Sequence, residues 1–144
     1  MDPSELGTQP ISEANPAGED IRHSQEYDAL HAEMDKLSKL TSDGKPIDWE
    51  NVQQIAEGIL AQKSKDILVA AYLAAAWQEN KGLQGVADGA TLLQQLTATF
   101  WENMFPPKKR KRGRVNAFSW WKERTNAFLQ DNTPEEAQPP QLID

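Results

Sequence analysis

Side chains that could perform chemistry are few in this sequence. The only two histidines, His23 and His31, have no acidic pair at metal-ligand spacing beside them, and the chain contains no cysteine. Neither a nucleophile elbow nor a phosphate-binding glycine loop is present. Adjacent carboxylates such as Glu19 and Asp20 lie in polar stretches, where solvation is enough to explain them. We therefore expect no enzymatic activity, no cofactor, no metal site and no small-molecule substrate.

A run of basic residues is the short motif that most clearly indicates binding. Residues 108–114, here called the basic run, hold six of the 15 lysines and arginines and no acid, so the rest of the chain carries a formal charge of −13 against −7 for the whole. Such a run is typical of nucleic-acid contacts, but no aromatic residue is interleaved and the acidic remainder opposes a polyanion. An acidic protein surface is the favoured target. The six residues are Lys108, Lys109, Arg110, Lys111, Arg112 and Arg114.

Other interpretations of the basic run remain open. The protein could be a nucleic-acid-binding regulator that uses residues 108–114, or the run could be a solvated loop between two helices with no partner at all. A structural spacer that binds nothing is a further class of function that fits the composition. A salt titration with DNA separates the first of these from protein docking, because phosphate neutralisation makes affinity fall steeply with salt.

The spacing of apolar residues predicts an all-α protein, a compact bundle of about five helices with no strand. Apolar residues that recur at intervals of three and four give each helix one apolar face. The central helix differs, because it is apolar on every side from Ile67 to Trp77 and must be surrounded by other helices or by lipid. That run is too short to cross a bilayer, so we expect protein around it. The helices are predicted over residues 25–40, 49–63, 64–81, 87–104 and 115–129.

Helix caps and aromatic residues supply further expectations. Asp48 is expected to cap the second helix and Ser64 the central one, with Asp66 in its first turn at the positive end of the helix dipole. Adjacent helical residues are about 100° apart, so Trp120 and Trp121 cannot both point inward, and one of them is expected to be available to a partner. The expected core residues are Trp49, Leu68, Trp77, Leu96, Phe100 and Trp101.

Composition divides the chain into three parts. Residues 1–24 contain five acids and form an extended or partly disordered lead-in that is too polar to join the core. Residues 25–132 form the helical domain. Residues 133–144 are rich in Pro, Gln and Glu and are expected to be a disordered linker to a further C-terminal region.

Three residues outside the basic run are candidates for contact. Asp20 and Arg22 in the lead-in either pair with charges on the bundle or meet a partner, and the sequence does not choose between these roles. Lys65 is a candidate because helix capping explains its neighbours but not this side chain.

The sequence opens on acidic residues and has no apolar run near the ~20 residues of a membrane span, so we expect a cytoplasmic protein without direct membrane insertion.

Several short motifs, taken in order, carry a resemblance to a known family. The chain resembles the ImpA-type N-terminal domain of the TssA proteins of bacterial type VI secretion, from Pro10 to about Trp121. No single motif is diagnostic, but their order and spacing are specific. The motifs are Pro10-Ile11-Ser12, Asn15-Pro16-Ala17-Gly18-Glu19-Asp20-Ile21-Arg22, Tyr27-Asp28-Ala29-Leu30, Asp48-Trp49, Lys63-Ser64-Lys65-Asp66, Gly82-Leu83-Gln84-Gly85, Asp88-Gly89, Phe100-Trp101, Pro106 and Arg114-Val115-Asn116-Ala117.

This resemblance implies a cytoplasmic assembly factor for a contractile, phage-tail-like injection machine. It implies a longer protein in which this module comes first and a missing C-terminal region supplies most of the oligomerisation. The implied partners are baseplate, membrane-complex, sheath or tube components, and the implied role is to prime or to cap tail assembly. The family leaves open which component is bound and whether sheath growth is started or stopped.

Overall fold

The protein is built from helices alone in the part that the structure describes, a computed structural model covering residues 2–38 and 45–132. The described residues contain no strand, only two isolated bridges between backbone segments, Gly18 with Ser64 and Asp66 with Phe105. The all-α prediction is therefore confirmed. The six helices are α1 (Pro3–Thr8), α2 (Gln25–Asp35), α3 (Trp49–Gln62), α4 (Ile67–Lys81), α5 (Leu83–Phe100) and α6 (Lys111–Asn132).

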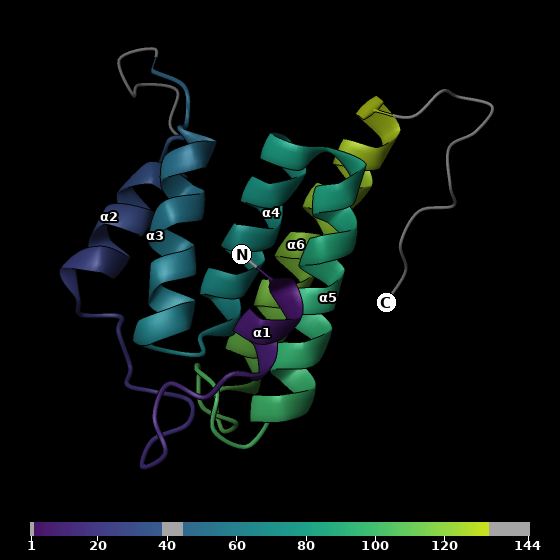
Figure 1. Ribbon diagram of the computed structural model, residues 1–144. Coiled ribbons are helices and arrows are strands. Elements are labelled where there is room, and N and C mark those ends of the chain that lie inside the picture. Colours follow the sequence, from purple (N-terminus) through teal and green to yellow (C-terminus); the bar gives the residue numbers. More distant parts are fainter. Residues whose placement is uncertain (1, 39–44, 133–144) are drawn as a thin grey trace.

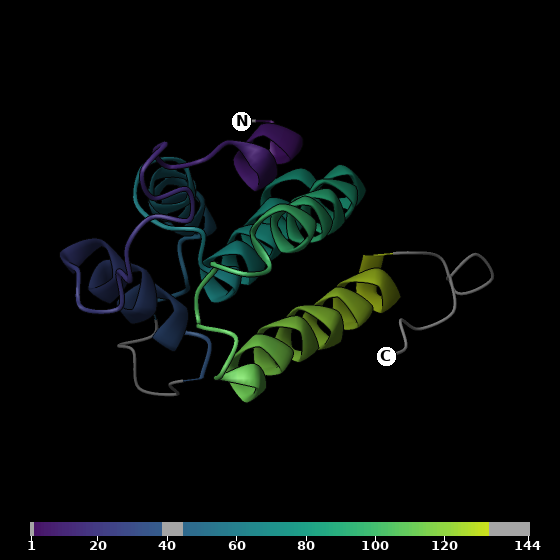
Figure 2. The same ribbon diagram turned by 90° about the horizontal axis from the view of Figure 1, so that it is seen from below.

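Helix α4 lies at the centre of the bundle, as its sequence predicts. It packs most extensively on α5 and also on α3 and α6, so protein surrounds it (Figures 1 and 2). Because its apolar residues occur on every side, nearly all of them are removed from water. The indole of Trp77 is fully buried, and its Nε1 donates to Oε2 of Glu57 at 3.2 Å. The buried α4 residues are Ile67, Val69, Ala70, Ala71, Leu73, Ala74, Ala75, Ala76, Trp77 and Gln78.

Glycine allows α5 to approach α4 closely. The chain reverses at Gly82, whose φ of 69° lies in the region that favours glycine, and α5 starts at the next residue. The sequence predicts that this helix begins only at residue 87, but Gly85 already belongs to the first turn of α5 and lies against the end of α4. A Cβ atom at Gly85 would lie 1.9 Å from the carbonyl oxygen of Trp77, and one at Gly89 would lie 2.7 Å from the Cβ of Ala74.

The lead-in joins the core, and the expectation that residues 1–24 stay outside it is wrong. Helix α1 packs on α5, with Asp2 as its N-cap and Leu6 buried (Figure 1). Ala17 and Ile21 are buried further along. The segment between Pro10 and Gly18 is irregular, as its prolines and glycine predict. Composition misled here because three isolated apolar residues anchor an otherwise polar segment.

Several helix ends differ from the sequence prediction. Helix α2 ends at Asp35, before the predicted end at residue 40, and residues 39–44 lie outside the described part. Helix α5 ends at Phe100 rather than at the predicted residue 104, and a turn at 101–103 follows it. Helix α6 begins at Lys111, so the second half of the basic run is helical rather than loop. The predicted linker, residues 133–144, also lies outside the described residues.

The aromatic predictions are confirmed in part. Trp77, Leu96 and Phe100 are buried, while Trp49 and Leu68 are partly buried against the same core. Trp101 was expected in the core but is 43% exposed. It follows Phe100 by one residue, a rotation of about 100°, so both rings cannot face inward.

Trp120 and Trp121 do not divide into one inward and one outward ring. Both are half-buried and pack against the core, and Trp120 meets Tyr72 edge to face with ring centroids 5.2 Å apart.

No helix in residues 2–38 and 45–132 is long and apolar enough to span a membrane.

Two glycine substitutions test the close approach of α5 to α4. Gly85→Ala should lower the free energy of unfolding by about 3 kcal/mol, because the new methyl group overlaps a backbone carbonyl that cannot rotate away. Gly58→Ala, in the middle of α3, is the matched control: a Cβ there meets no atom within 4 Å, and we expect a gain of about 0.5–1 kcal/mol from helix propensity. Urea unfolding followed by circular dichroism measures both, and equal effects would contradict this packing.

Candidate functional site

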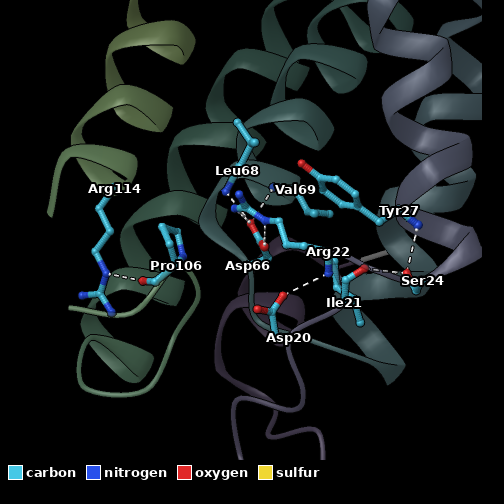
Figure 3. A network of polar contacts seen from close by, with 10 residues as sticks. All are labelled: Asp20, Ile21, Arg22, Ser24, Tyr27, Asp66, Leu68, Val69, Pro106 and Arg114. Atoms are coloured by element: carbon cyan, nitrogen blue, oxygen red, sulfur yellow. Dashed lines mark hydrogen bonds and ion pairs between the residues drawn. The ribbon is translucent and has the colours of Figure 1, made fainter. Parts of the chain in front are cut away.

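Charged residues from three distant parts of the sequence meet at one end of the bundle. The lead-in, the link between α3 and α4, and the connection from α5 to α6 gather there (Figures 1 and 2). Figure 3 shows the side chains of Arg22, Asp66 and Arg114 at this place, which we call the polar junction. Lys65 belongs to it as well, so the structure brings together four of the residues singled out from the sequence.

Backbone hydrogen bonds make the link between α3 and α4 the centre of the polar junction. Lys65 N donates to Ala17 O at 2.7 Å, and Glu19 N donates to Lys63 O at 3.0 Å. On the other side, Phe105 N donates to Lys65 O at 3.0 Å, and the Ile67 N–H bonds to Phe105 O. Three segments that are far apart in sequence are therefore held as neighbours.

Asp66 is the buried charge of the polar junction. It is fully buried, and its Oδ1 accepts from Leu68 N at 2.9 Å and Val69 N at 3.3 Å, which makes Asp66 the N-cap of α4. The expectation that Ser64 is the cap is wrong. Ser64 is buried two residues earlier, and its hydroxyl has no hydrogen-bond partner among the described residues. Because the helix begins later than predicted, the carboxylate takes the capping position.

Arg22 neutralises Asp66. Its Nε and Nη2 donate to the two carboxylate oxygens at 3.0 and 3.1 Å (Figure 3), and its guanidinium lies 5.5 Å from the centre of the Tyr27 ring. Partial burial lowers the pKa of Arg22, but the hydrogen bond and charge of Asp66 outweigh it, so the pKa is raised overall. Of the two roles left open for Arg22, the structure shows pairing with the bundle. Asp20 is exposed, and its carboxylate accepts from the Arg22 backbone N–H at 3.0 Å.

The sequence predicts a partner contact at Lys65, but this side chain is fully buried and cannot meet a partner. Its Nζ donates to Leu6 O at 2.7 Å and Leu60 O at 2.8 Å, and it lies 5.4 Å from the centre of the Phe100 ring. One ammonium group thus joins α1, α3 and α5. Among the described residues no ion pair offsets its charge, and burial lowers the pKa of Lys65 to about 8.

Arg114 belongs to the basic run in sequence but to the interior in structure. It is buried, and its Nε donates to the carbonyl of Pro106 at 2.8 Å (Figure 3). Its Nη1 and Nη2 donate to the carbonyls of Trp101 and Met104 at 2.8 and 2.9 Å. Its guanidinium also lies 4.7 Å from the centre of the Trp101 ring. Burial lowers the pKa of Arg114. The sequence predicts a partner contact at Arg114, but the structure makes this residue the anchor of the turn before α6.

The remaining five basic residues, 108–112, are exposed, and we call them the basic end of α6. Lys108 forms an ion pair with Glu102 at 2.9 Å. In the described part of the chain no ion pair is recorded for Lys109, Arg110, Lys111 or Arg112. Lys111 and Arg112 lie in the first turn of α6, where no acid is present and where the helix dipole disfavours positive charge.

A small hollow opens beside the basic end of α6. Its volume is about 230 Å³, and charged and apolar residues share its walls. No motif in the sequence predicts this hollow, because its lining comes from two distant segments, the lead-in and the turn before α6. The lining residues are Asp20, Arg22, His23, Phe105, Pro106, Pro107 and Arg110. Among the described residues no group of three or more His, Cys, Asp or Glu side chains could hold a metal ion.

Comparison with known proteins places the chain in a family. The family model described as "ImpA, N-terminal, type VI secretion system" matches residues 8–123, most of the sequence. The chain belongs to this ImpA N-terminal family. The resemblance inferred from the ordered motifs is thereby confirmed, and so is the assignment to type VI secretion.

Two relatives extend this result. A type VI secretion component TssA1 of Pseudomonas aeruginosa is 28% identical over a stretch covering 67% of this chain and 29% of the relative. The solved N-terminal domain of the TssA component from Burkholderia cenocepacia, which includes the ImpA N-terminal region, matches with a TM-score of 0.75 and 30% identity. That match covers 90% of this chain and 49% of the solved one. The ImpA N-terminal chain therefore spans less than a third of the curated relative.

The buried lysine predicts a pH dependence of stability. An unfolded lysine has a pKa of about 10.4, whereas burial lowers the pKa of Lys65 to about 8. Between these values the unfolded chain binds more protons, so the free energy of unfolding should rise with pH in this window. In Lys65→Met this rise should be absent. Urea unfolding from about pH 7 to 10 measures the free energy of unfolding of both proteins, and the tyrosines that they share cancel in the difference between the two profiles. Parallel profiles would show that Lys65 does not titrate in this range.

The anchoring role of Arg114 separates it from its basic neighbours. Arg114→Lys should lower the free energy of unfolding by about 2–4 kcal/mol, because a single ammonium cannot reach three carbonyls in the geometry of the guanidinium. Arg112→Lys, on an exposed side chain in the same helix turn, is the matched control and should have no effect. Thermal unfolding of the two variants tests this, and a stable Arg114→Lys protein would rule out the anchor.

Proposed function

We propose that this ImpA N-terminal domain is a non-enzymatic docking module of a TssA-like assembly factor. In this proposal it binds a baseplate, membrane-complex, sheath or tube component of the type VI secretion apparatus and helps to prime or cap tail assembly. Membership of the ImpA N-terminal family supports the setting. The observation that carries the docking role is the basic end of α6, a group of outward cations on a turn that Arg114 holds rigidly in place.

Rigidity matters for a docking module because ordering a surface on binding costs free energy. A long basic side chain on a mobile loop loses freedom twice, in the backbone and in the side chain. Here the backbone of the turn is already fixed by Arg114, and by two further hydrogen bonds of Phe105: its N–H donates to Lys65 O, and its carbonyl accepts from Ile67 N. Only the side chains of the basic end have to be ordered by a partner.

The proposal extends to the whole protein, because the relatives are longer than this chain. Since the chain spans less than a third of the TssA1 relative, we propose that residues 133–144 link this domain to a further region that supplies oligomerisation. Several copies of the docking module would then be displayed on one assembly, and weak individual contacts would add up to strong binding. A cytoplasmic location, with recruitment to the inner membrane through partners, fits this proposal.

The nucleic-acid regulator keeps one observation in its favour, the exposure of residues 108–112. The acidic remainder of the chain opposes it, because an extended polyanion would lie against that surface as well. Fluorescence titration with duplex and single-stranded DNA decides between the two. We expect no measurable binding at low salt, and tight binding with a steep salt dependence would favour the regulator.

Cross-linking in cells tests the docking role as a whole. The tagged domain is expressed in a bacterium with an active secretion apparatus, cross-linked with formaldehyde and purified under denaturing conditions. We expect adducts with a defined baseplate, membrane-complex, sheath or tube subunit, identified by mass spectrometry. The same strain lacking that subunit is the control. Adducts that never contain a secretion component would show that the domain is a spacer.

A further inference from the structure

The electrostatics of the basic end of α6 are unfavourable in the isolated domain. Five cations stand next to each other in sequence, and only Lys108 has an ion pair, with Glu102, in the described part of the chain. Lys111 and Arg112 add positive charge at the positive end of a 22-residue helix. Folding stability alone favours acids in this turn. An anionic group placed here would relieve both the repulsion and the dipole.

We propose that the basic end of α6 and the adjoining hollow lined by Arg22, His23 and Arg110 bind an acidic segment of a partner protein. This inference rests on the proposed docking function and names the chemistry of the segment that is docked. A carboxylate of the partner would enter the hollow. Neighbouring acids of the same segment would lie along residues 108–112.

The hollow has the size and lining for a carboxylate side chain. Its volume of about 230 Å³ is small, and Phe105, Pro106 and Pro107 give it apolar walls in which a charge–charge contact is screened less than in open water. Arg22 has five N–H donors, of which Asp66 takes two. That ion pair already holds the Arg22 side chain in place, so a further hydrogen bond to its guanidinium costs little side-chain entropy.

Asp20 limits how an anion can enter the hollow. Its carboxylate lines the same wall and accepts from the Arg22 backbone N–H at 3.0 Å. An incoming carboxylate must therefore approach from the side of Arg110, where the exposed cations continue. A segment that crosses the hollow and then follows the start of α6 gains contacts with the cations of residues 108–112. A free anion would meet the repulsion of Asp20 without those contacts, so the hollow favours the segment.

Apolar residues near the basic end favour a peptide over a nucleic acid. Trp101 is 43% exposed with its ring against the Arg114 guanidinium, and Val115 is 55% exposed one turn after Lys111 on the same side of α6. A rigid tryptophan beside cations is typical of the central residues of protein interfaces. A duplex offers nothing apolar to Val115 except base edges, and it would be repelled by the acidic remainder of the chain.

A fluorescein-labelled peptide of alternating glutamate and leucine is the probe for this inference. Its binding to the full chain is followed by fluorescence anisotropy at about 50 mM salt, where exposed charges interact over more than 10 Å. The double variant Lys109→Glu/Arg110→Glu should weaken binding about tenfold or more. Lys63→Glu, at an exposed lysine at the end of α3, is the matched control and should change affinity less than about twofold. The double variant should unfold at or above the temperature of the unaltered protein, because acids before α6 relieve the charge repulsion and suit the helix dipole. Lys63→Glu should change the unfolding temperature little.

The position of the probe is checked by nuclear magnetic resonance. Binding should shift the backbone amide signals of His23 and Arg110, which line the hollow from two different segments. Shifts confined to other parts of the domain would overturn the site. A peptide with glutamine in place of glutamate should not bind, and equal binding of that peptide would overturn the recognition of acid.

Other occupants give results that contradict the inference. Tighter binding of a DNA duplex than of the peptide would assign the surface to nucleic acid. Self-association of the domain at low salt, abolished by Lys109→Glu/Arg110→Glu, would assign it to a second copy of this chain. The docking function can fail separately: if the double variant still forms the same cellular adducts as the unaltered domain, docking stands and the acidic segment does not. If the unaltered domain forms none, docking itself is wrong.

Discussion

The buried carboxylate of Asp66 is the constraint on which the rest of the structure depends. Helix α4 must be apolar on every side to fill the centre of the bundle, so its N–H groups at the start have no water to bond. Asp66 satisfies two of them, and its own charge then requires a cation. Arg22 provides that cation, and it can do so only if the lead-in lies against the bundle. One helix cap therefore determines the course of a segment more than forty residues away in sequence.

The helices could be predicted from the sequence because their information is local and repeated. Apolar residues from Ile67 to Trp77 leave no alternative to a buried helix, and Asp48 precedes α3 as its N-cap in the structure as in the prediction. The lead-in offered no such pattern. Leu6 is a single apolar residue in polar surroundings. It becomes a core residue because α1 packs on α5 and α3, a surface that exists only when the bundle is assembled.

The candidate site could be predicted only in outline, because residue type does not reveal what a cation meets. Arg114 and Arg112 look equivalent in the basic run, yet one bonds to three backbone carbonyls and the other is exposed. Carbonyl acceptors carry no sequence signature, since every residue has one. The same holds for Lys65, whose acceptors are the carbonyls of Leu6 and Leu60. The basic run thus divides into an interior anchor and an exterior surface, and the anchor is what gives the surface a fixed shape.

The bond from Lys65 to Leu6 also sets the true extent of the folding unit. The family match begins at residue 8, whereas Leu6 belongs to α1. One of the two carbonyls that accept hydrogen bonds from the buried Lys65 ammonium therefore lies outside the matched region. In a shortened protein that starts at α2, the Lys65 ammonium would keep only the Leu60 carbonyl as acceptor, and Asp66 would lose Arg22. Any boundary drawn for expression, fusion or comparison with relatives should include α1, because the Leu6 carbonyl of that helix accepts a hydrogen bond from the buried Lys65.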